Sequence, residues 1–156
     1  MLLNIIASKK RWRRTQPAAQ FYELNLGVLY HGVDGMQFQT IPIMRIFDED
    51  KAKEFYLGFL GMALDWGHRF EDGYPIYMQV SLGDLVLHLS EHSGDCTPGS
   101  KVFVNVSDLD KLFAQITAKL YKYNKPSIED APWGARCFTV TDPFSNRILF
   151  NESADI

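Results

Sequence analysis

Hydrophobic positions from residue 41 onward follow first the period of a strand and then that of a helix. The β-rich run at 41–47 predicts a strand, and Asp48 after it is a favourable helix N-cap. Apolar side chains then recur at helical spacing up to Gly61, which predicts the end of that helix. These apolar side chains are Ala52, Phe55, Tyr56, Phe59 and Leu60.

Three further strands follow this helix. Residues 64–70, 76–82 and 85–90 are rich in β-formers, and turn-forming residues separate them at 71–73 and 83–84. The first half of the chain therefore predicts a β-α-β-β-β module over about residues 40–95.

The same plan recurs sixty residues later, over about residues 100–152. A strand is predicted at 101–107 and Asp108 is the next N-cap, at the same offset from Asp48. The apolar stripe of the second helix is predicted to be Leu109, Leu112, Phe113, Ile116 and Leu120. Clear strands at 135–141 and 147–151 flank a turn, and a weaker strand is predicted near Ser127. The pattern is that of an α+β fold made of tandem βαβββ modules.

Alternation along the strands predicts which side chains leave the helix-covered face. The leucines at 85, 87 and 89 suit that face, so Val86, His88 and Ser90 are expected on the opposite one. The same argument places Lys101, Phe103 and Asn105 opposite the valines of the second module, and Ile41, Ile43 and Arg45 on the open side of the first strand. We expect a groove of mixed, aromatic and partly basic character.

Composition is that of one soluble globular domain. The chain has 156 residues, of which 46% are hydrophobic and 22% charged. No apolar run approaches the roughly 20 residues needed to span a bilayer, so we expect a cytoplasmic protein without a membrane partner. The two cysteines, Cys96 and Cys137, provide neither a disulfide framework nor a CxxC zinc pair.

Charge divides the chain into two parts. Residues 1–38 have a net charge of +3 and are expected to form a partly disordered extension or a short helix, with a basic run at 9–14. That run is either an exposed extension or a nucleic-acid or membrane-surface patch. Residues 39–156, the predicted domain, have a net charge of −6, which disfavours nucleic acid and favours cationic small molecules.

Common catalytic signatures are missing or have the wrong spacing. His88, Glu91 and His92 match a zinc-protease pattern that requires a helix, but this segment alternates like a strand. Four strand residues span about 13 Å, too far for both histidines to bind one ion. The sequence has no G-x-S-x-G elbow, P-loop or G-x-G-x-x-G, so neither a serine hydrolase nor a nucleotide enzyme is indicated.

The segment Pro132-Trp133-Gly134-Ala135-Arg136, followed by Asp142-Pro143-Phe144-Ser145-Asn146, resembles the C-terminal part of bleomycin resistance proteins. These belong to the vicinal oxygen chelate superfamily, with glyoxalase I and the extradiol dioxygenases. The resemblance covers about residues 40–152 and implies that the modules form a curled, incomplete-barrel mixed sheet with the helices outside. Family members often have Gly at the position of Ser145, since Gly adopts positive φ without strain.

Enzymes of that superfamily bind a divalent metal at positions that the resemblance maps onto Ile41, His88, Lys101 and Leu149. Ile and Leu have no donor atom, and Lys is normally a cation, so three of the four cannot serve. We therefore expect no metal, no cofactor and no catalytic residues. A metal-dependent glyoxalase-like lyase or extradiol-type dioxygenase is the alternative.

The resemblance implies a non-enzymatic binding protein of the bleomycin-resistance type, which sequesters a bulky, cationic aromatic compound in a groove at a homodimer interface. The expected ligand is bleomycin-like or another aromatic compound. Its binding residues are predicted to be Arg45, Trp66, Tyr77, His88, Phe103 and Trp133. Core packing or dimer contact is the competing role for the aromatic residues, and an interaction module that uses its sheet only to dimerise is a third possibility.

Overall fold

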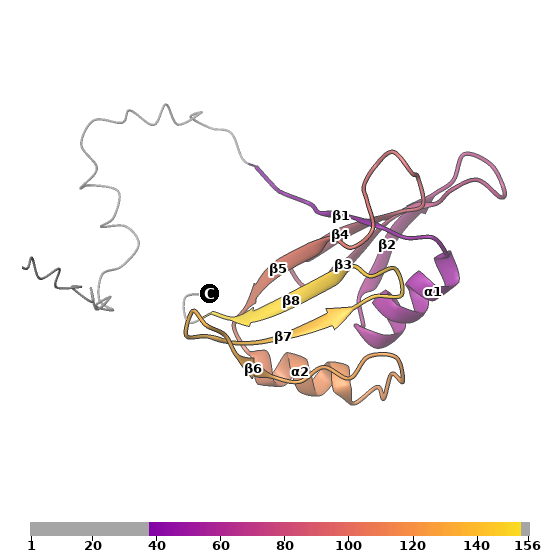
Figure 1. Ribbon diagram of the computed structural model, residues 1–156. Coiled ribbons are helices and arrows are strands. Elements are labelled where there is room, and N and C mark those ends of the chain that lie inside the picture. The colour runs from indigo at the N-terminus through magenta and orange to yellow at the C-terminus, as the bar shows by residue number, and fades with distance from the viewer. Residues whose placement is uncertain (1–37, 154–156) are drawn as a thin grey trace, which may run out of the picture. The chain divides into compact units, whose positions relative to one another are not determined.

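A computed structural model describes residues 38–153 and contains two successive βαβββ modules (Figure 1). The first comprises β1 (Ile43–Arg45), α1 (Glu49–Lys53), η2 (Glu54–Phe59), β2 (Ala63–His68), β3 (Tyr77–Leu82) and β4 (Leu85–Ser90). The second comprises β5 (Lys101–Val106), α2 (Leu109–Thr117), β6 (Glu129–Asp130), β7 (Arg136–Thr141) and β8 (Arg147–Glu152). The expectations for residues 1–37 lie outside the described residues.

The two modules have the same sheet topology. Their strand orders are β1-β4-β3-β2 and β5-β8-β7-β6. In each sheet the first and last strands of the module pair in parallel, and the other pairs are antiparallel. The sheets are mixed and do not close into a barrel, which confirms the α+β tandem fold predicted from the sequence.

Register also repeats between the modules. Ile43 lies beside His88 in the first parallel pair, and Phe103 lies beside Leu149 in the second. Phe103 follows Ile43 by the offset seen in the sequence, so the equivalence of these positions has a structural basis.

Both predicted N-caps are present. The Asp48 carboxylate accepts a hydrogen bond from the Lys51 backbone N–H at 2.9 Å, and Asp108 accepts one from that of Lys111 at 3.0 Å. The first helix then widens into the π-helix η2, where the Leu60 N–H donates to the Phe55 carbonyl five residues earlier. The apolar spacing did not predict this widening. All five apolar residues predicted for this helix are nevertheless buried.

The second helix ends earlier than its apolar stripe suggests. Leu109 and Ile116 are buried, but α2 stops at Thr117. Leu120 lies past that end, has φ of 49° and is 87% exposed. The prediction that Leu120 belongs to the apolar stripe of this helix is wrong, because the chain leaves the helix in a left-handed conformation, which turns this side chain away from the stripe.

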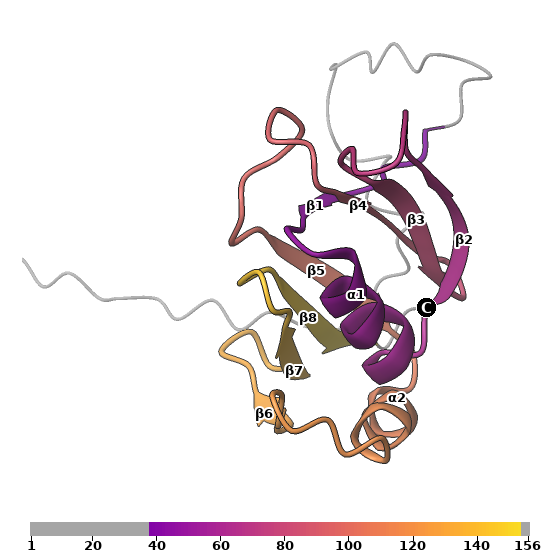
Figure 2. The same ribbon diagram turned by 90° about the vertical axis from the view of Figure 1, so that its right-hand side faces the viewer.

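The modules share one hydrophobic core. Figure 2 shows α1 between the two sheets and α2 against the sheet of the second module. The inward side chains Met78, Leu87, Phe138 and Phe150 belong to the same buried cluster as the first helix. This arrangement leaves the other face of each sheet outside the shared core, and all six residues of β2 are exposed. On that face of the second sheet, Leu149 is buried in a small second cluster with Ala131 and Cys137.

A buried polar clasp joins the modules through Asp142. One carboxylate oxygen of Asp142 accepts hydrogen bonds from the Tyr56 hydroxyl at 2.8 Å and the Asn146 side-chain amide at 2.7 Å. The other accepts from the backbone N–H groups of Phe144 and Asn146. The Asn146 amide also donates to the Arg45 carbonyl at 2.7 Å. Burial is the main cause that raises the pKa of Asp142, and the hydrogen bonds oppose the rise.

The clasp contains one unfavourable backbone conformation. Ser145 has φ of 71°, at the position where the resemblance favours Gly. We expect Ser145→Gly to stabilise the protein by about 0.5–1 kcal/mol, because Gly relieves the strain of a left-handed residue. Denaturant unfolding measures the change. Ser93→Gly is the matched control, since Ser93 lies in a loop at ordinary φ and should not gain stability. A loss of stability in Ser145→Gly would contradict this account of the turn.

Candidate functional site

The open face of the first sheet carries a cluster of aromatic and polar side chains, which we call the first-module face. The Trp66 and Tyr77 rings are stacked, with centroids 6.0 Å apart and planes inclined by 13°. The His88 ring meets each of them edge-on at 5.3 Å. Trp66 is 42% exposed, so this stack is open to solvent. The first-module face consists of Asp65, Trp66, Tyr77, Gln79, Ser81 and His88.

A β-bulge builds this face. Leu64 lies beside Val80 and Trp66 beside Gln79, so the intervening Asp65 has no direct partner in β3. The extra residue brings Asp65 to the same side as Trp66, where its carboxylate reaches the side chain of Gln79. Simple alternation would have placed these two neighbours on opposite faces.

The polar side chains form one directional chain of hydrogen bonds. Gln79 donates through its amide nitrogen to Asp65 at 2.9 Å, and Ser81 donates to the other Asp65 oxygen at 2.8 Å. The Gln79 oxygen can only accept, so Nε2 of His88, 2.9 Å away, carries the proton. Nδ1 of a neutral His88 then accepts from the Tyr77 hydroxyl at 2.9 Å. Desolvation raises the pKa of Tyr77, which keeps that hydroxyl protonated.

The open face of the second sheet carries a second cluster, the second-module face. Phe103 and Trp133 are 53% and 57% exposed, with centroids 6.0 Å apart. The Trp133 indole N–H donates to the Asn151 side chain at 2.8 Å, and Asn151 donates to Asn105 at 3.0 Å. The second-module face consists of Lys101, Phe103, Asn105, Trp133, Arg147 and Asn151.

The structure therefore brings together Trp66, Tyr77 and His88 on one face, and Phe103 and Trp133 on the other. Arg45 joins neither cluster. It is 9% exposed, its guanidinium donates to the Ser90 carbonyl at 3.5 Å, and it lies 4.8 Å from the centre of the Phe47 ring. Its placement on the open side of β1 follows the alternation, but the side chain is buried rather than presented to solvent.

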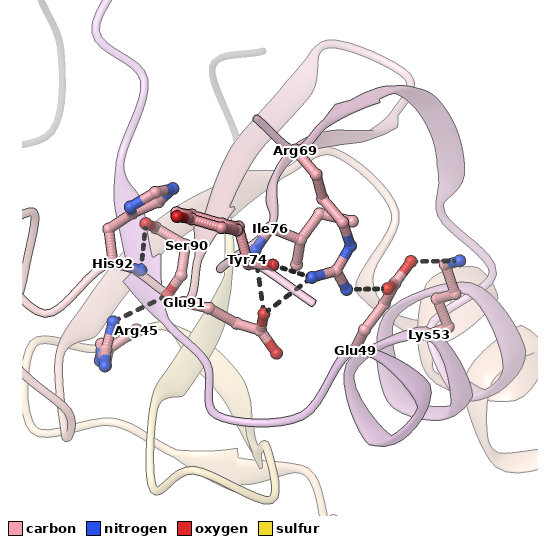
Figure 3. Close-up of polar contacts among 9 residues, drawn as sticks. All are labelled: Arg45, Glu49, Lys53, Arg69, Tyr74, Ile76, Ser90, Glu91 and His92. Carbon is pink, nitrogen blue, oxygen red and sulfur yellow. Dashed lines mark hydrogen bonds and ion pairs between the residues drawn. The ribbon is translucent and has the colours of Figure 1, made fainter. Parts of the chain in front are cut away.

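A separate ion-pair network ties the segment just after β2 to the first helix (Figure 3). Arg69 pairs with Glu49, and it lies 3.6 Å from Glu91. Lys53 reaches the same Glu49 at 2.6 Å, and hydrogen bonds from Lys53 and Arg69 lower the pKa of Glu49. Glu91 accepts from the backbone N–H of Ile76 at 2.9 Å. Glu91 is thus engaged in this network. The zinc-protease pattern does not lie on a helix, because His88 belongs to β4 and Glu91 and His92 follow the end of that strand.

A cleft of about 720 Å³ lies between the β3–β4 turn and β5. Among the six predicted site residues it includes Phe103 alone. Its lining is largely apolar, with Pro42, Leu82, Leu85, Val86 and Leu112 among the contributing side chains. The cleft runs along β5, and of the second-module face it includes Phe103 and Asn105.

The donor set does not fit a divalent metal. Both ring nitrogens of His88 are engaged by Tyr77 and Gln79, so binding a metal there would break one of these hydrogen bonds. The positions beside His88 and Leu149 are Ile43 and Phe103, which have no donor atom. No group of three or more His, Cys, Asp or Glu side chains within residues 38–153 is arranged to hold an ion.

Sequence reasoning placed His88, Lys101 and Asn105 on the open faces, but it did not single out Asp65, Gln79 and Ser81. Gln79 and Ser81 share the alternation of Tyr77 in β3, and that signal could have identified them. Asp65 could not be found in this way because the bulge interrupts the alternation.

Comparisons with known proteins bear on the family and the fold of the chain. Residues 30–156 match a family model described as glyoxalase superfamily protein. No curated protein sequence matches the chain. No helix among the described residues is long and apolar enough to cross a membrane.

Solved structures share the fold at low sequence identity. A bleomycin-binding protein in complex with bleomycin is 22% identical, with a TM-score of 0.57, over 75% of this chain and 99% of that one. The bleomycin-binding protein of bleomycin-producing Streptomyces verticillus, in complex with copper(II)-bleomycin, is 25% identical, with a TM-score of 0.58, over 76% and 98%. A glyoxalase family protein from Enterococcus faecalis is 13% identical, with a TM-score of 0.57, over 74% and 97%.

We expect the protein, purified without chelator, to contain well under one divalent metal ion per chain. The physical reason is that His88 is saturated by hydrogen bonds and its neighbouring strand positions offer no donors. Elemental analysis, and a melting temperature that EDTA does not change, check this. The expectation is wrong if each chain holds one tightly bound zinc, nickel, iron or manganese ion, and if His88→Ala loses both this ion and an activity. His92→Ala is the control and should then retain the ion.

Proposed function

The chain belongs to the glyoxalase superfamily, and from that premise we propose that it binds a bulky, cationic aromatic small molecule without transforming it. The observation that carries the proposal is the pair of solvent-open aromatic clusters, Trp66 with Tyr77 and Phe103 with Trp133. Flat, rigid rings give a large contact area to a planar ligand, and aromatic contacts add about 0.5–1.5 kcal/mol beyond area burial.

The missing donor set supports a binding role over the enzymatic alternative. A glyoxalase-like lyase or an extradiol-type dioxygenase needs a metal held by several side chains, and His88 has no donor residue beside it in the parallel pair. The similar structures titled as bleomycin complexes support bleomycin-like compounds as the ligand class. Sequestration of such a compound would protect a cell against it.

We further propose that the site is completed by a second copy of the chain. Among residues 38–153, no hydrogen bond, ion pair or ring contact joins the first-module face to the second-module face. Each face is therefore a single wall. A two-fold symmetric dimer would set the first-module face of one protomer opposite the second-module face of its partner and enclose two equal grooves.

The proposal places the protein in the cytoplasm. Cys96 and Cys137 are both free, and a reducing compartment keeps such thiols reduced.

Calorimetry with bleomycin tests the binding function. We expect a saturable complex that Trp66→Ala and Trp133→Ala each weaken by about two- to thirtyfold, which corresponds to roughly 0.5–2 kcal/mol for a lost indole contact. Tyr123→Ala is the matched control, because Tyr123 is 69% exposed and lies on neither face. If the wild type binds neither bleomycin nor a simple planar dye such as 9-aminoacridine, the proposed function is wrong.

Sedimentation tests the dimer, which we expect at tens of micromolar chain concentration. A mixture of Trp66→Ala and Trp133→Ala chains tests how the groove is built. If each groove takes one wall from each protomer, every mixed dimer regains one intact groove, and tight binding returns at about one site per mixed dimer. A monomer in sedimentation, or no recovery after the subunits have exchanged, would contradict this arrangement.

A further inference from the structure

The strands of the first sheet carry two formally charged side chains when histidine is neutral. These are Arg45 in β1 and Asp65 in β2. Arg45 is buried and held by the Ser90 carbonyl and the Phe47 ring, whereas Asp65 is exposed on the first-module face. The net charge that this face presents is therefore negative.

Nearby cations do not neutralise that charge. Arg69, just beyond β2, is turned toward α1 and is committed to Glu49 and Glu91 (Figure 3). Within residues 38–153, Asp65 forms no ion pair with a Lys, Arg or His side chain, and its partners are the neutral donors Gln79 and Ser81. Each carboxylate oxygen accepts one of these bonds and keeps capacity for another.

The hydrogen-bond chain makes the face rich in acceptors. The hydroxyl protons of Tyr77 and Ser81 and the Nε2 proton of His88 are all used within the chain. Lone pairs on Tyr77, Ser81 and Asp65 remain for a ligand. The donors not engaged among these residues are the Trp66 indole N–H and the second amide proton of Gln79, and both are neutral.

We infer that Asp65 is the residue that selects the charge of the ligand, a step that rests on the proposed binding function. Its carboxylate is the counter-ion for a protonated amine or amidine attached to a planar ring. The ring lies against Trp66 and Tyr77, and the cationic group donates to Asp65. An ion held in this way gains both a charge-assisted hydrogen bond and attraction to the aromatic faces.

A preference for cations has two candidate causes, the Asp65 carboxylate and the overall negative charge of the domain. The acidic domain as a whole attracts cations, but salt screens that attraction over about 8 Å at physiological ionic strength. If the overall charge decided selectivity, removal of any exposed carboxylate would have a similar effect. If Asp65 decides the selectivity, only the removal of the Asp65 carboxylate will reduce the preference for a cation.

Three tricyclic probes with the same ring test this, at pH 8, where an ordinary imidazole is neutral. They are 9-aminoacridine, a cation with N–H donors; acridine, which is neutral; and acridine-9-carboxylate, an anion. We expect the wild type to prefer the cation. Asp65→Asn should lower the affinity for 9-aminoacridine by about tenfold, as expected for the loss of one charge-assisted hydrogen bond. The affinity for acridine should change by less than about twofold. Asp65→Glu should retain most of the preference, because it keeps the charge.

Asp50→Asn is the control for overall charge, since Asp50 is exposed in the first turn of α1 and away from the face. Unchanged melting temperatures show that the variants are folded. An equal loss of cation binding in Asp50→Asn and Asp65→Asn would overturn the inference but leave the proposed function intact. A wild type that binds all three dyes equally would overturn both the inference and the proposed preference for cations, and would leave only the binding of aromatic compounds. If no dye and no bleomycin binds, both the function and the inference fail.

Discussion

The arrangement of the two modules depends on the buried carboxylate of Asp142. It accepts hydrogen bonds from Tyr56 in the first helix and from the turn that contains Asn146, and Asn146 in turn binds the carbonyl of Arg45. A carboxylate at this depth is tolerated because every side of it meets a donor. Removing one partner would leave a buried polar group unsatisfied, at a cost of about 1–3 kcal/mol. The clasp thereby fixes the first helix against the last β-turn of the second module.

That constraint decides which surfaces remain for a ligand. The shared core takes up the helices and the inner face of each sheet, so the outer faces are the surfaces left open. The aromatic residues divide in the same way. Phe55, Tyr56 and Phe138 pack inside, whereas Trp66, Phe103 and Trp133 stay more than two-fifths exposed. Large aromatic side chains left open on both sheets, at positions that a partner could cover, are more consistent with recognition than with stability of the isolated chain.

The hydrophobic periodicity predicted the elements that depend on interactions between residues close in the sequence. The strands, both N-caps and the repeated module follow from side-chain alternation and short-range hydrogen bonding, and the structure confirms them. The exceptions depend on contacts that no local pattern contains. Leu120 is exposed because a left-handed residue ends the helix early. Asp65 shares a face with Trp66 because of a bulge, and Arg45 is buried although its strand position is on the open side.

The equivalent positions of the two modules have acquired different chemistry. Beside Ile43, the first module has His88 within a hydrogen-bonded chain that ends on a carboxylate. Beside Phe103, the second module has Leu149, and the cations Lys101 and Arg147 form the pair two residues earlier, on the same face. A symmetric dimer that set one face against the other would therefore present a negative, acceptor-rich wall opposite an aromatic wall with a basic end. In a dimer whose basic end lay away from Asp65, a ligand would have one favourable orientation, because reversing it would place its cationic group beside Lys101 and Arg147.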